Sequence, residues 1–333
     1  MVELSNTRPI GILAGYLLAC AGLTVFCIRI AWTRGGSSRP VDRRRRHAIV
    51  VFSALAALSL ATTWYHMFCF FQWSYQEWAA ASSASSPLFG LLGGEDGKLH
   101  LGAWLRDTTL FQQAWVATLE TPLRAWWSMQ IFGFCAIWSV MLAAQGQKSR
   151  IPHLWLFMLL GQIVAISFAA NLSFVTFLVY DEANEVSSIH DKKDMKKNQP
   201  SPNPQATRNS WLPTAWLAVL GVNLISALII PRQLDHSKFL YLLLAPHVLA
   251  FVPFVLNAVF AAPHPSDALF FSSRQPSTVA RAGIMAVLLA AACSRVFAAG
   301  GDLGQIAATL FDRKMGMTAI LGLALFYSVL WCL

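Results

Sequence analysis

The stretch IGILAGYLLACAGLTVFCI, residues 10–28, contains no charged side chain, and four consecutive arginines follow it at Arg43–Arg46. A helix needs about 20 apolar residues to cross the hydrocarbon core of a bilayer, and this stretch has that length. Basic residues collect on the cytoplasmic side of membrane proteins, so the arginines predict that residue 28 faces the cytoplasm. The first run therefore predicts a spanning helix whose start lies on the outer side, rather than a cleaved signal peptide.

Seven similar apolar runs follow the first one. The eight predicted spans lie near residues 10–28, 48–71, 125–144, 151–180, 211–230, 239–262, 282–299 and 315–333. Hydrophobic residues make up 56% of the 333-residue chain and charged residues only 12%. A soluble domain carries about 25% charged residues, so a soluble enzyme and a disordered chain are both excluded. The predicted fold is a single all-α membrane domain, a polytopic transmembrane helix bundle of about eight spans.

Two polar segments interrupt the runs, and with eight spans both lie on the outer side. Residues 74–121 are rich in turn-forming residues at first and then polar with helical composition, which predicts a short interfacial helix. Asp107 occupies the expected N-cap of that helix and Pro122 its expected end. Residues 181–210 are rich in Pro, Ser and Asn and predict a flexible polar loop.

The net charge of +9 is distributed in short loops between apolar runs. This distribution indicates a lipid bilayer as the partner, with the arginine run on the anionic cytoplasmic leaflet, and not a nucleic acid. The six cysteines lie inside apolar runs, and no two of the eight histidines stand four residues apart on one span. We therefore expect no metal site, and no phosphate-binding or dinucleotide motif indicates a cofactor. The oligomeric state is left open.

Most of the thirteen tryptophans fall in the predicted outer half. An aromatic belt at the interface is one interpretation, and a cavity walled by indole faces is the other. Polar side chains inside the spans extend the second interpretation, although amides in spans usually only bond one helix to another. The candidate substrate-binding residues, which we expect to converge on one outer cavity, are Trp115, Trp126, Trp127, Gln130 and Asn171.

Four acids flank spans on the same predicted side: Asp107, Glu120, Asp181 and Glu182. The candidate catalytic residues among them are Asp107, Glu120 and Glu182. Helical i,i+4 spacing would place Phe111 and Trp115 beside Asp107. A carboxyl group in a dry, apolar pocket keeps its proton near neutral pH and can act as a general acid. The alternatives are an N-cap for Asp107 and a solvated helix end for Glu120.

Several segments resemble one family. The sequences are ATTWYHMFCFFQWSY (61–75), RDTTLFQQAW (106–115), WWSMQ (126–130), QGQKSRIPHLW (145–155) and GQIVAISFAANLSF (161–174). They resemble the fungal integral-membrane terpene cyclases of meroterpenoid biosynthesis, of the ascochlorin and ascofuranone type, over about a third of the chain. The resemblance rests on aromatic and span-edge patterns and not on a catalytic motif.

The resemblance implies a metal-free cyclase of secondary metabolism in the endoplasmic reticulum membrane. Its substrate would be a hydrophobic prenylated aromatic or polyketide with an epoxidised tail. An acid would protonate the epoxide, carbocations would close the tail, and a base would end the cascade. The alternative is a non-enzymatic membrane protein such as a transporter of a hydrophobic metabolite, which would need polar groups near mid-membrane and alternating access.

Overall fold

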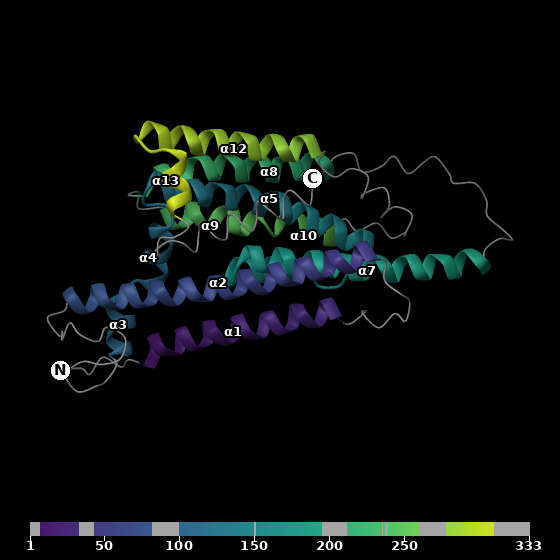
Figure 1. The fold of residues 1–333 in the computed structure, drawn as a ribbon, viewed down its shortest axis with the longest axis horizontal. Helices are drawn as coiled ribbons and strands as arrows, with labels where there is room; N and C mark the ends of the chain where they lie inside the picture. The colour runs from purple at the N-terminus through teal and green to yellow at the C-terminus, as the bar shows by residue number, and fades with distance from the viewer. Residues whose placement is uncertain are drawn as a thin grey trace.

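The structure is a computed structural model that describes residues 7–32, 43–81, 100–149, 151–194, 212–234, 236, 239–259 and 278–309. For residues 147, 148, 181–194, 212–216, 278 and 280 it describes the backbone alone. Every regular element in these ranges is a helix, which confirms the predicted all-α class. The long helices run side by side along one axis (Figure 1). We call the end where α1 begins the outer end, and the end where α1 finishes the inner end.

The helices in chain order are α1 (Thr7–Trp32), α2 (Arg43–Ala81), α3 (Leu101–Asp107), α4 (Leu110–Ala117), α5 (Pro122–Ser149), α6 (Trp155–Ile163), α7 (Ile166–Asp194), α8 (Leu212–Ile229), the 3-10 turn η1 (Ile230–Arg232), α9 (Phe239–Leu249), α10 (Val252–Val259), α12 (Thr278–Ala298) and α13 (Leu303–Ala308).

Four of the described helices are long and apolar enough to cross a membrane, namely α1, α2, α5 and α12. The pair α9–α10 passes the same test as one span bent by 42°. Pro246 lies inside α9 and Pro253 in the first turn of α10. Proline removes a backbone N–H and displaces the preceding turn, which accounts for the bend. The predicted span at 315–333 lies outside the described residues.

The predicted span at 151–180 is not one continuous helix in the structure. The helix breaks at Val164 and Ala165, which separate α6 from α7. At nine residues, α6 is about 14 Å long, less than half the thickness of a hydrocarbon core. Just before α6, His153 lies 6.5 Å from the ring of Phe26, near the inner end of α1.

Contacts with α1 give the path of this segment. At the end of α6, the carbonyl of Ile163 accepts a hydrogen bond from the Tyr16 hydroxyl at 3.0 Å, near the middle of α1. The Tyr180 hydroxyl on α7 then lies 3.4 Å from the carbonyl of Ile30, back at the inner end. The segment starts at the inner end, turns half-way along α1 and returns, so α6 and α7 form a helical hairpin.

The hairpin fills the inner half of the bundle between α1, α2 and α5. Trp138 of α5 is fully buried against it, stacks on Phe134 and donates its indole N–H to the Ser173 hydroxyl at 3.2 Å. Phe157 and Leu160 of α6 are also fully buried. Interrupted backbone is tolerated at membrane depth only where protein surrounds it, and this packing provides that environment for the break at 164–165.

The remaining helices pack on the other side of α5. Leu220 of α8 lies with Ala144 near the inner end of α5, whereas Ile230, just beyond α8, lies with Ala125 near its outer end. Helix α8 therefore runs from the inner end to the outer end. The pair α9–α10 runs back again, because the Asn257 amide bonds to the carbonyl of Ala143 at 2.8 Å.

Helix α12 runs in the same direction as α8. Ile284 packs in the cluster near the inner end of α5, and Val296 packs against Trp127 near its outer end. Gly133 of α5 sits directly under the Leu288 side chain, which lets the two helices approach closely. The short helix α13 then lies across the outer end (Figure 1).

The two polar segments also differ from their predictions. Helix α2 continues through Ala81, and two short helices, α3 and α4, replace the single predicted interfacial helix. Asp107 is the last residue of α3 instead of an N-cap, and Pro122 begins α5 instead of ending a helix. Residues 181–194, predicted as part of a flexible loop, continue α7, and residues 195–211 lie outside the described ranges.

Candidate functional site

The short helices α3 and α4 are anchored to the outer end of α2 through one buried serine. Ser74 of α2 accepts a hydrogen bond from the indole N–H of Trp104 at 3.2 Å. Its hydroxyl then donates to the Gln113 side chain at 3.0 Å. Trp104 is 2% exposed, so α3 is attached by a buried indole that has its polar atom satisfied.

Aromatic side chains collect around this anchor. The outer aromatic cluster consists of Phe70, Phe71, Trp73, Tyr75, Trp78 and Trp104. The ring centres of Tyr75 and Trp104 are 5.9 Å apart at a steep angle, and those of Tyr75 and Trp78 are 5.6 Å apart. In edge and tilted arrangements the positive edge of one ring meets the negative face of another, which stabilises the cluster.

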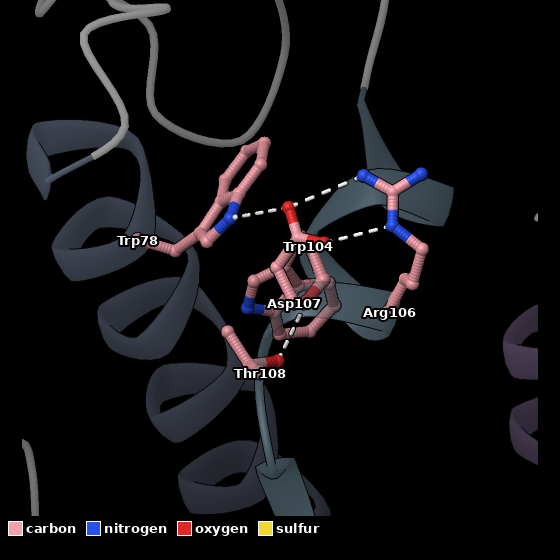
Figure 2. Close-up of polar contacts among 5 residues, drawn as sticks. All are labelled: Trp78, Trp104, Arg106, Asp107 and Thr108. Atoms are coloured by element: carbon pink, nitrogen blue, oxygen red, sulfur yellow. Dashed lines mark hydrogen bonds and ion pairs between the residues drawn. The ribbon is translucent and has the colours of Figure 1, made fainter. Parts of the chain in front are cut away.

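Asp107 lies at the edge of the outer aromatic cluster. Its carboxylate accepts a hydrogen bond from the Arg106 Nε at 2.8 Å and a longer one from the indole N–H of Trp78 at 3.4 Å (Figure 2). The Arg106 guanidinium holds the pKa of the Asp107 carboxyl below its ordinary value. The Asp107 side chain is 39% exposed. In this geometry Asp107 is an anion at neutral pH and not the protonated acid that a dry pocket would produce.

The expected i,i+4 alignment of Asp107 with Phe111 and Trp115 is wrong. Thr108 has extended backbone, and its hydroxyl donates to the Trp104 carbonyl at 2.7 Å, which ends α3 (Figure 2). Helix α4 begins at Leu110, after Thr109, whose backbone is not helical. The indole beside the carboxylate is consequently Trp78, which comes from a different helix.

The two other candidate acids lie elsewhere. Glu120 is 57% exposed and pairs with Arg124 one turn later, at 2.9 Å, in the connection between α4 and α5. This is a solvated helix end, as the alternative interpretation held. The backbone of Glu182 follows Tyr180 at the inner end of the bundle, whereas Asp107 lies at the outer end. The three acids therefore do not share one site.

The candidate tryptophans point in different directions. The Trp115 ring lies 6.3 Å from His247 of α9. The indole N–H of Trp126 donates to the Cys293 sulfur at 3.3 Å, toward α12. The indole N–H of Trp127 donates to the Thr309 hydroxyl at 2.9 Å, just after α13. Trp126 and Trp127 contact each other, with ring centres 4.7 Å apart, and serve to attach α12 and α13 to α5.

The two candidate amides are both inside the bundle. The Asn171 amide is fully buried on α7 and donates to the Ser167 carbonyl at 2.8 Å, one turn earlier. The side-chain nitrogen of Gln130 is buried on α5 without a hydrogen-bond partner. The five predicted substrate-binding residues are thus distributed over the α2–α7 contact, the α5–α12 contact and the α4–α9 contact. The structure does not bring them together in one cavity.

Sequence reasoning missed a polar face of α2 that meets α7. Ser59, Thr63 and His66 follow helical spacing and are all buried. The Ser59 hydroxyl bonds to the Ser167 hydroxyl of α7. An ionisable side chain inside an apolar span is a common mark of function, and His66 is 8% exposed within α2. The i, i+4, i+7 spacing inside the apolar run 48–71 was the available signal.

Among the described residues, no three His, Cys, Asp or Glu side chains lie close enough together to hold a metal ion. The outer aromatic cluster with Asp107 places a carboxylate beside aromatic rings from two helices, and we take it as the candidate site. No protein-family model, curated protein or solved structure matches this chain.

Proposed function

We propose that the chain is a multi-pass membrane protein with seven crossings and one re-entrant hairpin. The crossings are α1, α2, α5, α8, the α9–α10 pair, α12 and the apolar run 315–333. The hairpin α6–α7 replaces the fourth of the eight predicted spans. The order of contacts along α1 supports this reading, because the segment returns to the inner end from which it started.

The distribution of basic residues also supports seven crossings. On this topology residues 181–210, with Lys192, Lys193, Lys196, Lys197 and Arg208, lie on the same side as Arg43–Arg46. Sixteen of the 25 Lys and Arg residues then lie on the inner side, against fourteen with eight spans. Membrane proteins retain basic residues on the cytoplasmic side, so the inner end faces the cytoplasm.

For activity, we propose a membrane-bound terpene cyclase that closes an epoxidised prenyl tail on an aromatic head group, in the endoplasmic reticulum membrane. A proton adds to the epoxide oxygen, the C–O bond breaks, new bonds form along the tail, and one proton is lost at the end. The product is an isomer of the substrate. The observation that carries the proposal is the Asp107 carboxylate beside the outer aromatic cluster.

The geometry favours one role for Asp107 within this reaction. An ionised carboxylate accepts a proton, so Asp107 suits the base that ends the cascade better than the acid that starts it. Indole faces stabilise a carbocation without attacking it, and Trp78 stands beside the carboxylate and packs on Tyr75.

The transporter alternative is supported less well. Alternating access requires a path that opens to each side of the membrane in turn. The inner half of the bundle is filled by fully buried side chains, including Trp138, Phe157 and Leu160. This packing leaves no room among these side chains for a path to the inner side, which favours the enzyme over the transporter.

The test is an assay of microsomes that contain the full chain. The probe is a phenol with a farnesyl tail and a terminal epoxide, and the expected product is a cyclic isomer of equal mass. Asp107→Asn keeps size and removes the base, so turnover should fall at least about 100-fold. Glu120→Gln, a matched change at a solvated acid, should leave turnover unchanged. Equal turnover in Asp107→Asn and the unmodified chain would overturn the role of Asp107. No product with this class of substrate would count against the cyclase.

A further inference from the structure

A second feature of the outer end is a cavity of about 530 Å³ between the start of α1 and the α3–α4 connection. Cavities that bind small molecules usually have volumes of about 300–1,000 Å³. Its polar lining comes from Arg8, Arg106, Thr108, Thr109 and Gln112, and its apolar lining from Pro9, Ile12, Leu13, Leu105, Leu110 and Phe111. We call it the outer cavity.

We propose that the outer cavity binds an amphipathic ligand with an anionic head group, a carboxylate or a phosphate. The head group is held by Arg8 and Arg106, and the apolar body lies along α1. This site is separate from the outer aromatic cluster, and the proposal does not depend on the cyclase activity.

The charge of the lining selects the head group. Two guanidinium groups reach the cavity from separate helices, and none of its described lining residues is acidic. Arginine suits carboxylate and phosphate because its planar fork donates two parallel hydrogen bonds. Residues 110–112 of the first turn of α4 also line the cavity, and the Thr109 side chain does not cap this helix. The first N–H groups of a helix have no partner within the helix and attract anions.

The apolar lining selects the rest of the ligand. Ile12 and Leu13 lie one turn further along α1 from Arg8, and Ile12 is 54% exposed. Phe111 is 45% exposed and packs edge-on against Tyr16 with ring centres 5.5 Å apart, which continues the apolar surface toward the middle of the bundle. A ligand with a charged head and a hydrocarbon body matches this order of polar and apolar groups, and a small inorganic anion does not.

Arg106 connects the outer cavity to Asp107. The same guanidinium lines the cavity and bonds to the Asp107 carboxylate at 2.8 Å. An anionic head group in the cavity competes with Asp107 for those N–H donors. Ligand binding therefore weakens the Arg106–Asp107 pair, and removal of Asp107 strengthens ligand binding.

The test uses the full chain in nanodiscs of phosphatidylcholine. The probe is a photoactivatable C16 fatty acid, with its methyl ester as the uncharged control. We expect the acid to label residues within 8–13 and 105–112. Arg8→Gln and Arg106→Gln should each reduce labelling about 10-fold or more, since each removes charge-assisted hydrogen bonds. Arg124→Gln should leave labelling unchanged, because Arg124 pairs with Glu120 away from the cavity.

Two comparisons separate the outcomes. The Arg106→Lys protein retains the positive charge and should bind the fatty acid more tightly than the Arg106→Gln protein. The Arg8→Gln protein keeps the Arg106–Asp107 pair. Together these two variants distinguish loss of the site from a general loss of folding. Competition by phosphatidylglycerol in the disc identifies a lipid as the ligand, and competition only by free single-chain acids identifies a soluble amphipath. Either result supports the site. Equal labelling by acid and methyl ester, or unchanged labelling in both Arg8→Gln and Arg106→Gln, overturns it.

Discussion

The re-entrant hairpin gives a prediction about the side of the membrane on which residues 195–211 lie. An Asn-X-Thr acceptor for glycosylation inserted near residue 203 should stay unmodified, because glycosylation occurs on the lumenal side. The same acceptor inserted near residue 90, between α2 and α3, should be modified. The two insertions form a matched pair in polar segments of similar length.

The lengths of α6 and of the apolar part of α7 show that neither is long enough to cross a bilayer. Helix α6 has nine residues and rises about 14 Å, and α7 falls about 22 Å between Ile166 and Tyr180. Neither distance reaches the roughly 30 Å of a hydrocarbon core. A single span over 151–180 would instead need α6 and α7 to continue in one direction, whereas their contacts with α1 show that α7 runs back.

The assay is expression in microsomes with and without an endoglycosidase, read as a mobility shift. The hairpin predicts a shift for the acceptor near residue 90 and none for the acceptor near residue 203. A shift for the acceptor near residue 203 would refute the re-entrant path and restore the eighth span. A cysteine at residue 203 should react with a membrane-impermeant maleimide only from the cytoplasmic side, which checks the result independently of glycosylation.

Three further predictions follow from the packing and from the ion pair. At Gly161 an added Cβ would lie 2.9 Å from the Trp138 ring and 3.4 Å from the Ile166 Cα, so Gly161→Ala should destabilise the protein by about 1–3 kcal/mol in a thermal or denaturant assay. Gly221→Ala on α8, where nothing lies within 4 Å, should be neutral or stabilising by up to about 1 kcal/mol, and equal effects at both sites would contradict the packing. A double-mutant cycle with Ser59→Ala and Ser167→Ala should give a coupling of about 0.6 kcal/mol, and a coupling of zero would argue against that interhelical bond. Because Arg106 lowers the pKa of Asp107, their pair persists above the ordinary carboxyl pKa of about 4 and is lost as pH falls through the lowered value. An alkyl sulfonate, which stays anionic, should bind the outer cavity more tightly as pH falls through that range. The Asp107→Asn protein should bind the sulfonate tightly at every pH. The same pH dependence of binding in both proteins would exclude Asp107 as the group that titrates.

Much of the architecture is encoded locally. Each apolar run of about 20 residues must become a helix in a bilayer, because isolated backbone N–H and C=O groups are too costly there. The described residues of the runs at 10–28, 48–71, 125–144, 211–230 and 282–299 are accordingly helical, apart from the turn at Ala299. Composition alone was sufficient for the helical class, since it excludes a charged, water-covered surface.

The direction in which each helix runs and the neighbours of each side chain are not encoded in single apolar runs. Residues 151–180 are apolar throughout, and composition does not distinguish a straight span from two helices that fold back on each other. The surrounding helices decide this, because burial of the break by α1, α2 and α5 makes interrupted backbone tolerable. Spacing along the chain likewise placed Asp107 beside Phe111, whereas the extended Thr108 directs it to Trp78 on another helix.

The sequence by itself determined that this chain forms apolar helices separated by short polar segments. Only the tertiary structure decided which acid meets which ring, that Arg106 keeps Asp107 ionised, and that the fourth apolar run turns back. The physical reason is the distance along the chain over which each effect acts. Hydrophobic length acts on each segment separately, whereas the ionisation of a carboxyl group and the path of a broken helix depend on neighbours that are distant in the chain.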